Sequence, residues 1–237
     1  SFILHNNYLL FDLLNGLSAS QYLSEGKKLI DEGILDLMPE ETAYPEVIHK
    51  AMHYSLLAGG KRLRSVLVIA ASEAVGGDRK AVLPFAVAAE LIHTYTLIHD
   101  DLPALDNDDL RRGKPTNHKV FGEAVAILAG DALLTEAFIL MTRAAGMESI
   151  PPECILKATH EMSTALGSKG MIGGQVVDLE SEGKPIDEET LEYIHIYKTG
   201  FLIRACIRCG GMLGQATSRQ LNSLSRFGAH IGLAFQI

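Results

Sequence analysis

Apolar residues recur at helical spacing along most of the chain, and strict alternation of apolar and polar positions is scarce. The predicted helices cover residues 65–75, 84–99, 123–145, 153–167, 187–213 and 218–237. Short stretches rich in Gly and Pro separate these segments, and the sequence shows neither an internal repeat nor a long linker. The pattern therefore predicts an all-α fold with one domain over 1–237.

The composition is that of a soluble domain, with 237 residues, 47% hydrophobic residues and a net charge of -8. This acidic balance argues against nucleic acid as a partner, because nucleic-acid-binding proteins present a basic face. The three cysteines do not form the pattern of a disulfide framework, and we expect Cys206 and Cys209 to be thiols in the core. These features suit a cytoplasmic protein.

The segment 1–17 is apolar, but it lacks a basic start and contains Asp12, so it does not resemble a signal peptide. We expect either an extra helix there or a remnant foreign to the domain. The richest apolar stretch, 81–98, is broken by Pro84 and Glu90. No run approaches the roughly 18 uninterrupted apolar residues of a membrane span, so we predict no such span.

Five aspartates lie within ten positions, 100–109, directly after the apolar segment 84–99. Asp100 and Asp101 would stand at the C-terminal end of a helix, where the helix dipole disfavours anions. A bound cation would account for them, since Mg²⁺ takes carboxylate oxygens and bridges to phosphates. His93, seven residues before Asp100, would share its helix face. Taken alone, however, a charge run is equally consistent with a solvated surface.

A second charged segment, GGKRLR, places three basic side chains after two glycines, which let the backbone approach a ligand closely. Arginine can grip phosphate oxygens with its two-pronged guanidinium. The segment is not a nucleotide-binding P-loop, and by itself it is equally consistent with a helix start carrying solvated charges. A further motif, GGQVVDL, offers Gln175 and Asp178 on one face, which we interpret as a polar pair in the core.

Four motifs occur in the order typical of the trans-isoprenyl diphosphate synthases, the polyprenyl synthetase family: GGKRLR, LIHDDLPALDNDDLRRGKPTNHKVFGE, GGQVVDL and YKTG. From about residue 45 to its end, the chain resembles this family, and most closely its bacterial farnesyl diphosphate synthases. The resemblance implies a helical bundle around a central apolar cavity, a homodimer, and Mg²⁺-dependent joining of isopentenyl diphosphate to an allylic diphosphate.

The resemblance also implies roles for single residues. Asp100 and Asp106 would coordinate Mg²⁺ on the allylic diphosphate, and Asp101 would support them. Contacts to the allylic diphosphate would come from Arg111, Lys198, Thr199 and Gln236. Isopentenyl diphosphate would be held by Gly60, Lys61, Arg64, His93 and Arg112. Metal and arginines would neutralise the leaving diphosphate, so that the allylic C–O bond ionises, and a dry cavity would protect the carbocation.

The length of the product depends on the residues one turn before Asp100, Tyr95 and Thr96, which we expect to line the cavity for the growing chain. In this family a bulky residue at the fifth position before the first aspartate tends to close the cavity. Tyr95 therefore favours farnesyl diphosphate (C15). Geranylgeranyl diphosphate (C20) is the alternative, because synthases of that type share DDLPALD but carry smaller residues there. If Tyr95 is an ordinary core aromatic, the length stays open.

The sequence departs from the family in two places. The second aspartate-rich motif of the family would begin directly after Ile237. A chain without it would lack a further Mg²⁺ site, and we expect it to be inactive or nearly so. Ser65 stands where the family usually has Pro, and we expect little effect from this difference.

Three other classes of protein share part of the pattern. A terpene cyclase has the same helical fold and metal chemistry, but it would not need GGKRLR, and the sequence lacks the Asn/Asp–Ser/Thr–Glu metal triad of cyclases. A non-catalytic subunit of a heteromeric prenyl synthase often loses the first aspartate motif, which is intact in this chain. A helical protein that only binds cations would not require the basic segment.

Overall fold

The computed structural model describes residues 17–143 and 149–234, and within these ranges the fold is all-α apart from one short hairpin. The helices are α2 (Ala19–Leu37), α3 (Glu46–Leu56), α4 (Leu63–Glu73), α5 (Arg79–Asp100), α6 (Asn117–Phe121), α7 (Glu123–Arg143), α8 (Pro152–Leu166), α9 (Met171–Ser181), α10 (Glu188–Ile194), the π-helix η2 (His195–Gly200), α11 (Phe201–Leu213) and α12 (Ser218–Ala234). The strands β1 (Leu110–Arg111) and β2 (Lys114–Pro115) pair antiparallel. The predicted all-α class is confirmed. The helix expected within 1–17 lies, apart from Leu17, outside the described residues.

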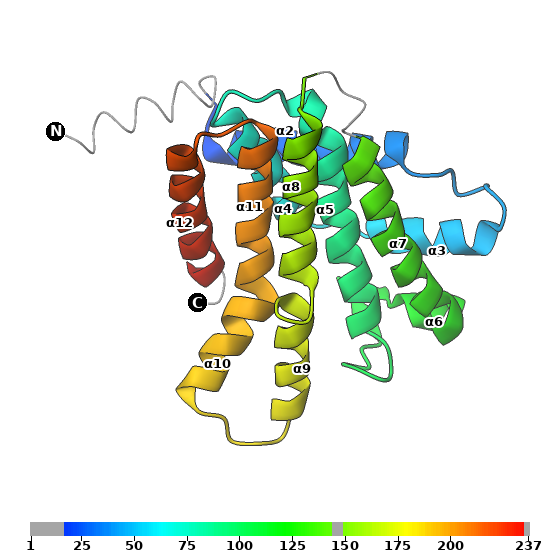
Figure 1. Cartoon of the computed structure of the whole chain (residues 1–237). Coiled ribbons are helices and arrows are strands. Elements are labelled where there is room, and N and C mark those ends of the chain that lie inside the picture. Colours follow the sequence, from blue (N-terminus) through cyan, green and yellow to red (C-terminus); the bar gives the residue numbers. More distant parts are fainter. Residues whose placement is uncertain (1–16, 144–148, 235–237) are drawn as a thin grey trace.

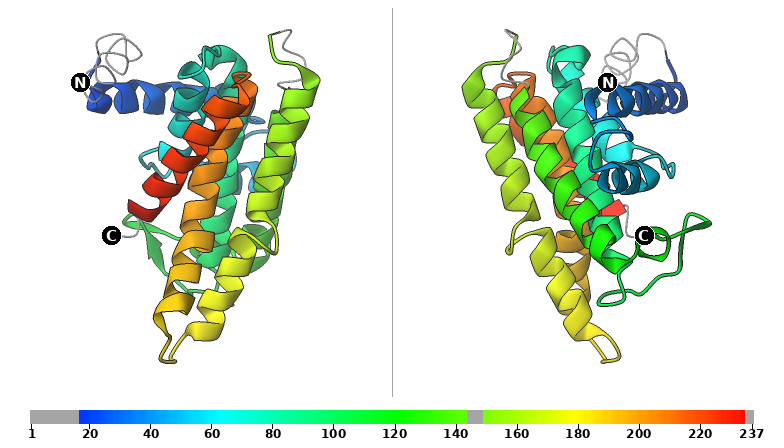
Figure 2. Two further views of the ribbon diagram at one scale, coloured as in Figure 1. Left: turned by 60° about the vertical axis from the view of Figure 1, so that its left-hand side comes forward. Right: turned by 90° about the vertical axis from the view of Figure 1, so that its right-hand side faces the viewer.

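The long helices α5, α7, α8 and α11 run side by side (Figure 1). In this bundle α5 packs on α4 and α7, and α11 packs on α4, α8 and α12. Helix α2 crosses the bundle on one side (Figure 2). Helices α9 and α10 extend beyond the end of the bundle at which α5 terminates (Figure 1). The polar motifs of the sequence therefore meet at this end.

Helix α5 is the central helix and carries much of the core. Its side chains Phe85, Leu91 and Ile92 are fully buried, and burial of each such side chain contributes about 1.5–3 kcal/mol. Asp78 caps the helix by accepting a hydrogen bond of 3.1 Å from the backbone N–H of Lys80. Because of this cap, the helix begins at Arg79, earlier than the predicted start at residue 84.

Four helices were missing from the prediction, namely α2, α3, α6 and α9. Helix α9 contains the two glycines of GGQVVDL, which disfavour a helix by propensity alone. Its neighbour explains them, because a Cβ atom at Gly174 would lie 2.6 Å from the backbone nitrogen of Lys198. Gly174 thus lets α9 approach η2 closely, and this tertiary contact outweighs the local preference.

Within residues 17–143 and 149–234, two helices, α5 and α7, are long and apolar enough to cross a membrane by length and composition. One point of the sequence analysis is corrected: the most apolar stretch lies in α7 and not at 81–98. In the most apolar stretch of 18 residues in each helix, 78% is buried inside the protein in α5 and 39% in α7. The burial of α5 is that of a core helix, whereas α7 presents an apolar face to the outside.

The two cysteines of α11 behave as predicted. Cys206 and Cys209 are free thiols buried in the core. Burial raises the pKa of Cys206 to about 12, so the thiol stays protonated and acts as a small apolar side chain.

Candidate active site

The acidic run begins where α5 ends. Asp100 is the last residue of the helix and Asp101 is its C-cap, as the sequence predicted. The chain then turns back, and the backbone N–H of Asp106 donates a hydrogen bond of 2.8 Å to the carbonyl oxygen of Asp100. Burial raises the pKa of Asp100 to about 6, and the negative charge of Asp106 adds to the shift while Lys198 opposes it. Neither Asp100 nor Asp106 forms an ion pair in the described part of the chain, although the charge of Lys198 acts on Asp100.

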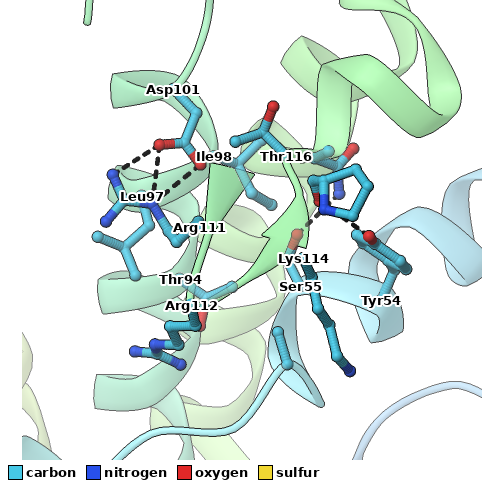
Figure 3. Close-up of a pocket in the computed structure, with 13 residues that line it drawn as sticks. Tyr54, Ser55, Thr94, Leu97, Ile98, Asp101, Arg111, Arg112, Lys114 and Thr116 are labelled. Carbon is cyan, nitrogen blue, oxygen red and sulfur yellow. Dashed lines mark hydrogen bonds and ion pairs between the residues drawn. The ribbon is translucent and has the colours of Figure 1, made fainter. Parts of the chain in front are cut away.

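Asp101 has a different environment, because it is buried and paired with Arg111. The guanidinium Nε of Arg111 donates to both carboxylate oxygens of Asp101, at 2.7 and 3.0 Å, and its Nη2 lies 2.6 Å from Oδ1. Figure 3 shows this two-pronged contact. The bond to Asp101 raises the pKa of Arg111. The charge of Asp101 is thus neutralised inside the protein, which suits a supporting role.

The RRGK sequence forms a two-residue hairpin turn, which the sequence analysis did not predict. Its central residues, Arg112 and Gly113, have φ angles of 53° and 77°. Such turns normally carry Asn-Gly or Asp-Gly, and an arginine at positive φ gives no such signal. The turn separates the two arginines, since Arg111 points toward Asp101 and Arg112 points away from it (Figure 3). The Arg112 guanidinium covers Gly60, where a Cβ atom would lie 2.8 Å from Nη1.

A basic pocket of about 410 Å³ lies between the start of α4, helix α5 and this hairpin. It is lined by Gly60, Lys61, Arg62, Leu63, Arg64, Glu90, His93 and Arg112. These include all five residues that the resemblance assigns to isopentenyl diphosphate, so the structure brings them together. Their roles stay predictions.

The cations of this pocket differ in their partners. Arg62, the basic residue of GGKRLR to which the sequence analysis assigned no role, turns inward and forms ion pairs with Glu90 and Asp31. Lys61, Arg64 and Arg112 form no ion pair with any carboxylate in the described part of the chain. Three unpaired cations that line one pocket are suited to a multiply charged anion such as a diphosphate.

His93 joins the basic pocket from α5. Its Nε2 lies 3.3 Å from Nη1 of Arg64, which donates to it. Burial lowers the pKa of His93 well below its usual range, and the charges of Arg64 and Arg112 act in the same direction. His93 is therefore neutral, so its Nε2 accepts from Arg64 and its Nδ1 carries the proton.

A second cavity, of about 420 Å³, opens beside the end of α5. It is lined by Arg64, His93, Tyr95, Thr96, Leu97, His99, Asp100, Leu105, Met171, Ile172, Gln175, Val176, Leu179, Lys198, Thr199 and Leu202. The predicted residues Tyr95, Thr96, Asp100, Lys198 and Thr199 thus share one cavity. Arg64 and His93 line both cavities, so the two adjoin.

Lys198 and Thr199 enter this cavity from η2, a single π-helical segment, and such segments are frequent at functional sites. Nζ of Lys198 lies 2.5 Å from Oδ2 of Asp178 on α9. The side-chain nitrogen of Gln175 is buried without a hydrogen-bond partner among the described residues. This corrects the interpretation of Gln175 and Asp178 as a core pair, since Gln175 lines the cavity and Asp178 holds Lys198 at its edge.

The carboxylates at the cavity can be tested for their fit to a metal ion. Among the described residues, no group of three or more His, Cys, Asp or Glu side chains is arranged to hold one. Mg²⁺ needs less, because it usually binds through one or two carboxylates, water and substrate phosphates. Asp100 and Asp106 fit this mode, because a backbone hydrogen bond holds them close together and neither forms an ion pair in the described part of the chain. Gln236, the remaining predicted residue, lies outside the described residues.

Comparison with known proteins identifies the family. The sequence profile described as Polyprenyl synthetase matches residues 45–237. The chain belongs to the polyprenyl synthetase family. It is 51% identical to the farnesyl diphosphate synthase of Geobacillus stearothermophilus, over 93% of this chain and 74% of that protein. The resemblance derived from the four motifs is therefore confirmed.

Other members of the polyprenyl synthetase family are almost as similar. The heterodimeric geranylgeranyl pyrophosphate synthase large subunit 1 of Arabidopsis thaliana, a chloroplastic protein, is 47% identical, over 91% of this chain and 58% of that protein. Among solved structures, an FPP/GFPP synthase from Zymomonas mobilis superposes with a TM-score of 0.85 at 37% identity. It matches over 92% of this chain and 78% of that chain. The family thus includes similar relatives whose names give different product lengths.

Proposed function

We propose that the protein is a prenyltransferase that condenses isopentenyl diphosphate head-to-tail with geranyl or dimethylallyl diphosphate and releases farnesyl diphosphate. One observation carries this proposal: a pocket with three unpaired cations adjoins a cavity that is lined by the carboxylate of Asp100 and by apolar side chains. A reaction between two diphosphates needs such a pair of sites. The similarity to the farnesyl diphosphate synthase of Geobacillus stearothermophilus supports the same activity.

Each site suits one of the substrates. In the basic pocket, Lys61, Arg64 and Arg112 would bind the diphosphate of isopentenyl diphosphate and leave its double bond facing the second cavity. In that cavity, Asp100 and Asp106 would hold Mg²⁺, which neutralises the leaving diphosphate of the allylic substrate. Both substrates would thus meet beside His93 and Arg64, where the two cavities adjoin.

The remaining residues of the cavity would act on the allylic substrate. The cation of Lys198, held by Asp178, lies at the edge of the cavity and would contact its diphosphate. Thr199 would direct its hydroxyl to the same group, and Arg111, fixed by Asp101, would approach from the hairpin. The apolar side chains of α9 would exclude water from the carbocation that forms when the C–O bond ionises.

The product length follows from Tyr95, which supports farnesyl diphosphate as the main product. Its ring is 7% exposed, lines the cavity and stands edge-on to His99 at a centroid distance of 5.7 Å. A buried ring held against His99 would close the cavity to a longer chain. The alternative product is geranylgeranyl diphosphate, which the name of the Arabidopsis relative favours.

Analysis of the product tests this proposal and the role of Tyr95 together. Full-length protein, meaning the natural chain with any residues that follow Ile237, is incubated with geranyl diphosphate, isopentenyl diphosphate and Mg²⁺. It is expected to yield a C15 diphosphate, read by mass spectrometry. Replacing Tyr95 with Ala opens the cavity and is expected to shift the product to C20. Replacing Tyr22 with Ala serves as the control, and the product is expected to remain C15. Tyr22 is a half-buried tyrosine on α2 whose hydroxyl donates a hydrogen bond to Glu73.

Three outcomes contradict parts of the proposal. A C20 product from the unchanged protein rejects Tyr95 as the limit of the cavity but retains the class of reaction. A C15 product from the Tyr95→Ala variant likewise rejects Tyr95 as the limit of the cavity and retains the class of reaction. No product from the full-length protein rejects prenyl transfer and favours a non-catalytic subunit.

We further propose a cytoplasmic homodimer built on the outer face of α7. This face exposes Ile127, Leu128 and Ile139, whose exposed fractions are 44%, 57% and 44%. A row of exposed apolar side chains on one helix is typical of a surface that another protein covers. Light scattering is expected to give the mass of two chains, and a Leu128→Asp substitution is expected to give the mass of one.

A further inference from the structure

Glu90 lies in the wall of the basic pocket and is 2% exposed, although the proposed reaction assigns it no role. Its two carboxylate oxygens bind different groups at the start of α4. Oε1 accepts a hydrogen bond of 2.8 Å from Nη1 of Arg62, and Oε2 accepts one of 3.0 Å from the hydroxyl of Ser65. Glu90 therefore binds the start of α4 through Arg62 and Ser65, which lie on either side of Arg64 in the sequence.

Arg62 is held on every side of its guanidinium group. Besides Glu90, it donates from Nε to Asp31 at 2.8 Å and from Nη2 to the carbonyl oxygen of Leu56 at 2.6 Å. Burial acts to lower the pKa of Arg62, but the charges and hydrogen bonds of Glu90 and Asp31 together outweigh it and raise the pKa. With its donors engaged, Arg62 anchors the loop instead of binding a diphosphate.

The backbone at Arg62 shows what this anchor holds. Arg62 is the N-cap of α4 and has a positive φ of 51°, which is uncommon for a residue other than glycine. It stands between Lys61, which enters the pocket, and Arg64, which contacts His93. Glu90 lies three residues before His93, so the two side chains share one face of α5. This face therefore contacts Arg62 and Ser65 through Glu90, and Arg64 through His93.

We propose that Glu90 is the positioning residue of the isopentenyl diphosphate pocket, acting through Arg62 and Ser65 to direct Lys61 and Arg64 at the diphosphate. The inference rests on the proposed function, since it names the substrate of this pocket. Ser65 is fully buried and donates one of the two hydrogen bonds that join Glu90 to the start of α4. The sequence did not indicate this role. A proline at this position would leave Oε2 of Glu90 without this partner.

Substitution of Glu90 by Gln tests the proposal, because the amide keeps the shape but loses the charge and one accepting oxygen. The KM for isopentenyl diphosphate is expected to rise about tenfold or more, because the loss of a hydrogen bond to a charged group typically weakens an interaction by that factor. The KM for geranyl diphosphate and kcat are expected to change by less than about twofold, since Mg²⁺ at Asp100 and Asp106, and not Lys61 or Arg64, would hold the diphosphate of geranyl diphosphate. Ser65→Ala, which removes one neutral hydrogen bond, is expected to raise the same KM about threefold.

Glu161→Gln is the matched control, because Glu161 on α8 accepts hydrogen bonds from Arg208 at 2.6 and 3.3 Å and lines neither cavity. It also removes a carboxylate from an arginine, and both KM values are expected to stay as they are. Calorimetric titration with isopentenyl diphosphate in EDTA provides a readout that does not require turnover. In this titration Glu90→Gln is expected to bind more weakly than the unchanged protein.

Several results would overturn the proposal. One is equal affinity of the Glu90→Gln and unchanged proteins for isopentenyl diphosphate in EDTA, with only the melting temperature lowered. An equal rise of both KM values also overturns it, because that indicates general distortion. If the unchanged protein makes no product, prenyl transfer fails as the function, and the titration in EDTA still decides the role of Glu90. If Glu90→Gln does not fold, Ser65→Ala decides by the same titration.

Discussion

Replacing Asp100 with Asn is expected to lower kcat for prenyl transfer by about 100- to 1000-fold, the loss typical when one group that stabilises developing charge is removed. Asp100 is half-buried at the end of α5, beside Asp106 and at the edge of the larger cavity. The amide keeps the size of the side chain but removes the charge that would hold Mg²⁺. The measurement is kcat at saturating Mg²⁺, geranyl diphosphate and isopentenyl diphosphate.

The control for this substitution comes from the same acidic run. Asp109 is exposed and forms an ion pair of 2.7 Å with Lys119, away from the cavity. Because surface ion pairs contribute little, Asp109→Asn is expected to leave kcat within about twofold of the unchanged protein. An equal loss in both variants would mean that the total charge of the run matters, and it would contradict a metal site at Asp100.

Arg111→Ala is expected to cause the second large effect, a loss of about 2 kcal/mol in the free energy of unfolding. Removing one partner of a fully buried ion pair costs about 3–5 kcal/mol, and the lower figure allows for the partial exposure of Arg111. The cost arises at Asp101, which is 3% exposed and would lose its ion-pair partner. Denaturant unfolding followed by circular dichroism measures the change, and prenyl transfer is expected to fall as well.

The neighbouring arginine provides the control. Arg112 forms no ion pair in the described part of the chain, and burial and the charge of Arg62 lower its pKa. Arg112→Ala removes an unpaired cation, so the free energy of unfolding is expected to stay within about 0.5 kcal/mol of its original value. Affinity for isopentenyl diphosphate is expected to fall. Equal destabilisation by the two substitutions would contradict the distinct surroundings of the two arginines.

The position of the acidic site could be predicted because it depends on local rules. A long apolar periodic segment predicts α5, and the aspartates that follow predict carboxylates at its C-terminal end. The position of Tyr95 and Thr96 in the cavity follows from the same helix, because they lie about one turn before Asp100. These residues therefore occupy the cavity that the sequence indicated.

The rest depends on contacts between segments far apart in the sequence. Nothing in GGKRLR indicates that Arg62 turns inward and Arg64 does not, because the difference arises from Glu90 and Asp31 on other helices. The role of Asp178 likewise depends on the approach of α9 to η2, which Gly174 permits. A single sequence shows which residues are present, but not which of them become partners.

The most direct measurement is the metal dependence of binding at the two cavities. Full-length protein is titrated calorimetrically with isopentenyl diphosphate and with an unreactive thio analogue of geranyl diphosphate, each in Mg²⁺ and in EDTA. A basic pocket without a metal predicts that isopentenyl diphosphate binds about equally in both conditions. A carboxylate cavity predicts that the analogue binds only with Mg²⁺. Binding of the analogue in EDTA as strongly as in Mg²⁺ would contradict a metal-borne diphosphate at Asp100 and Asp106.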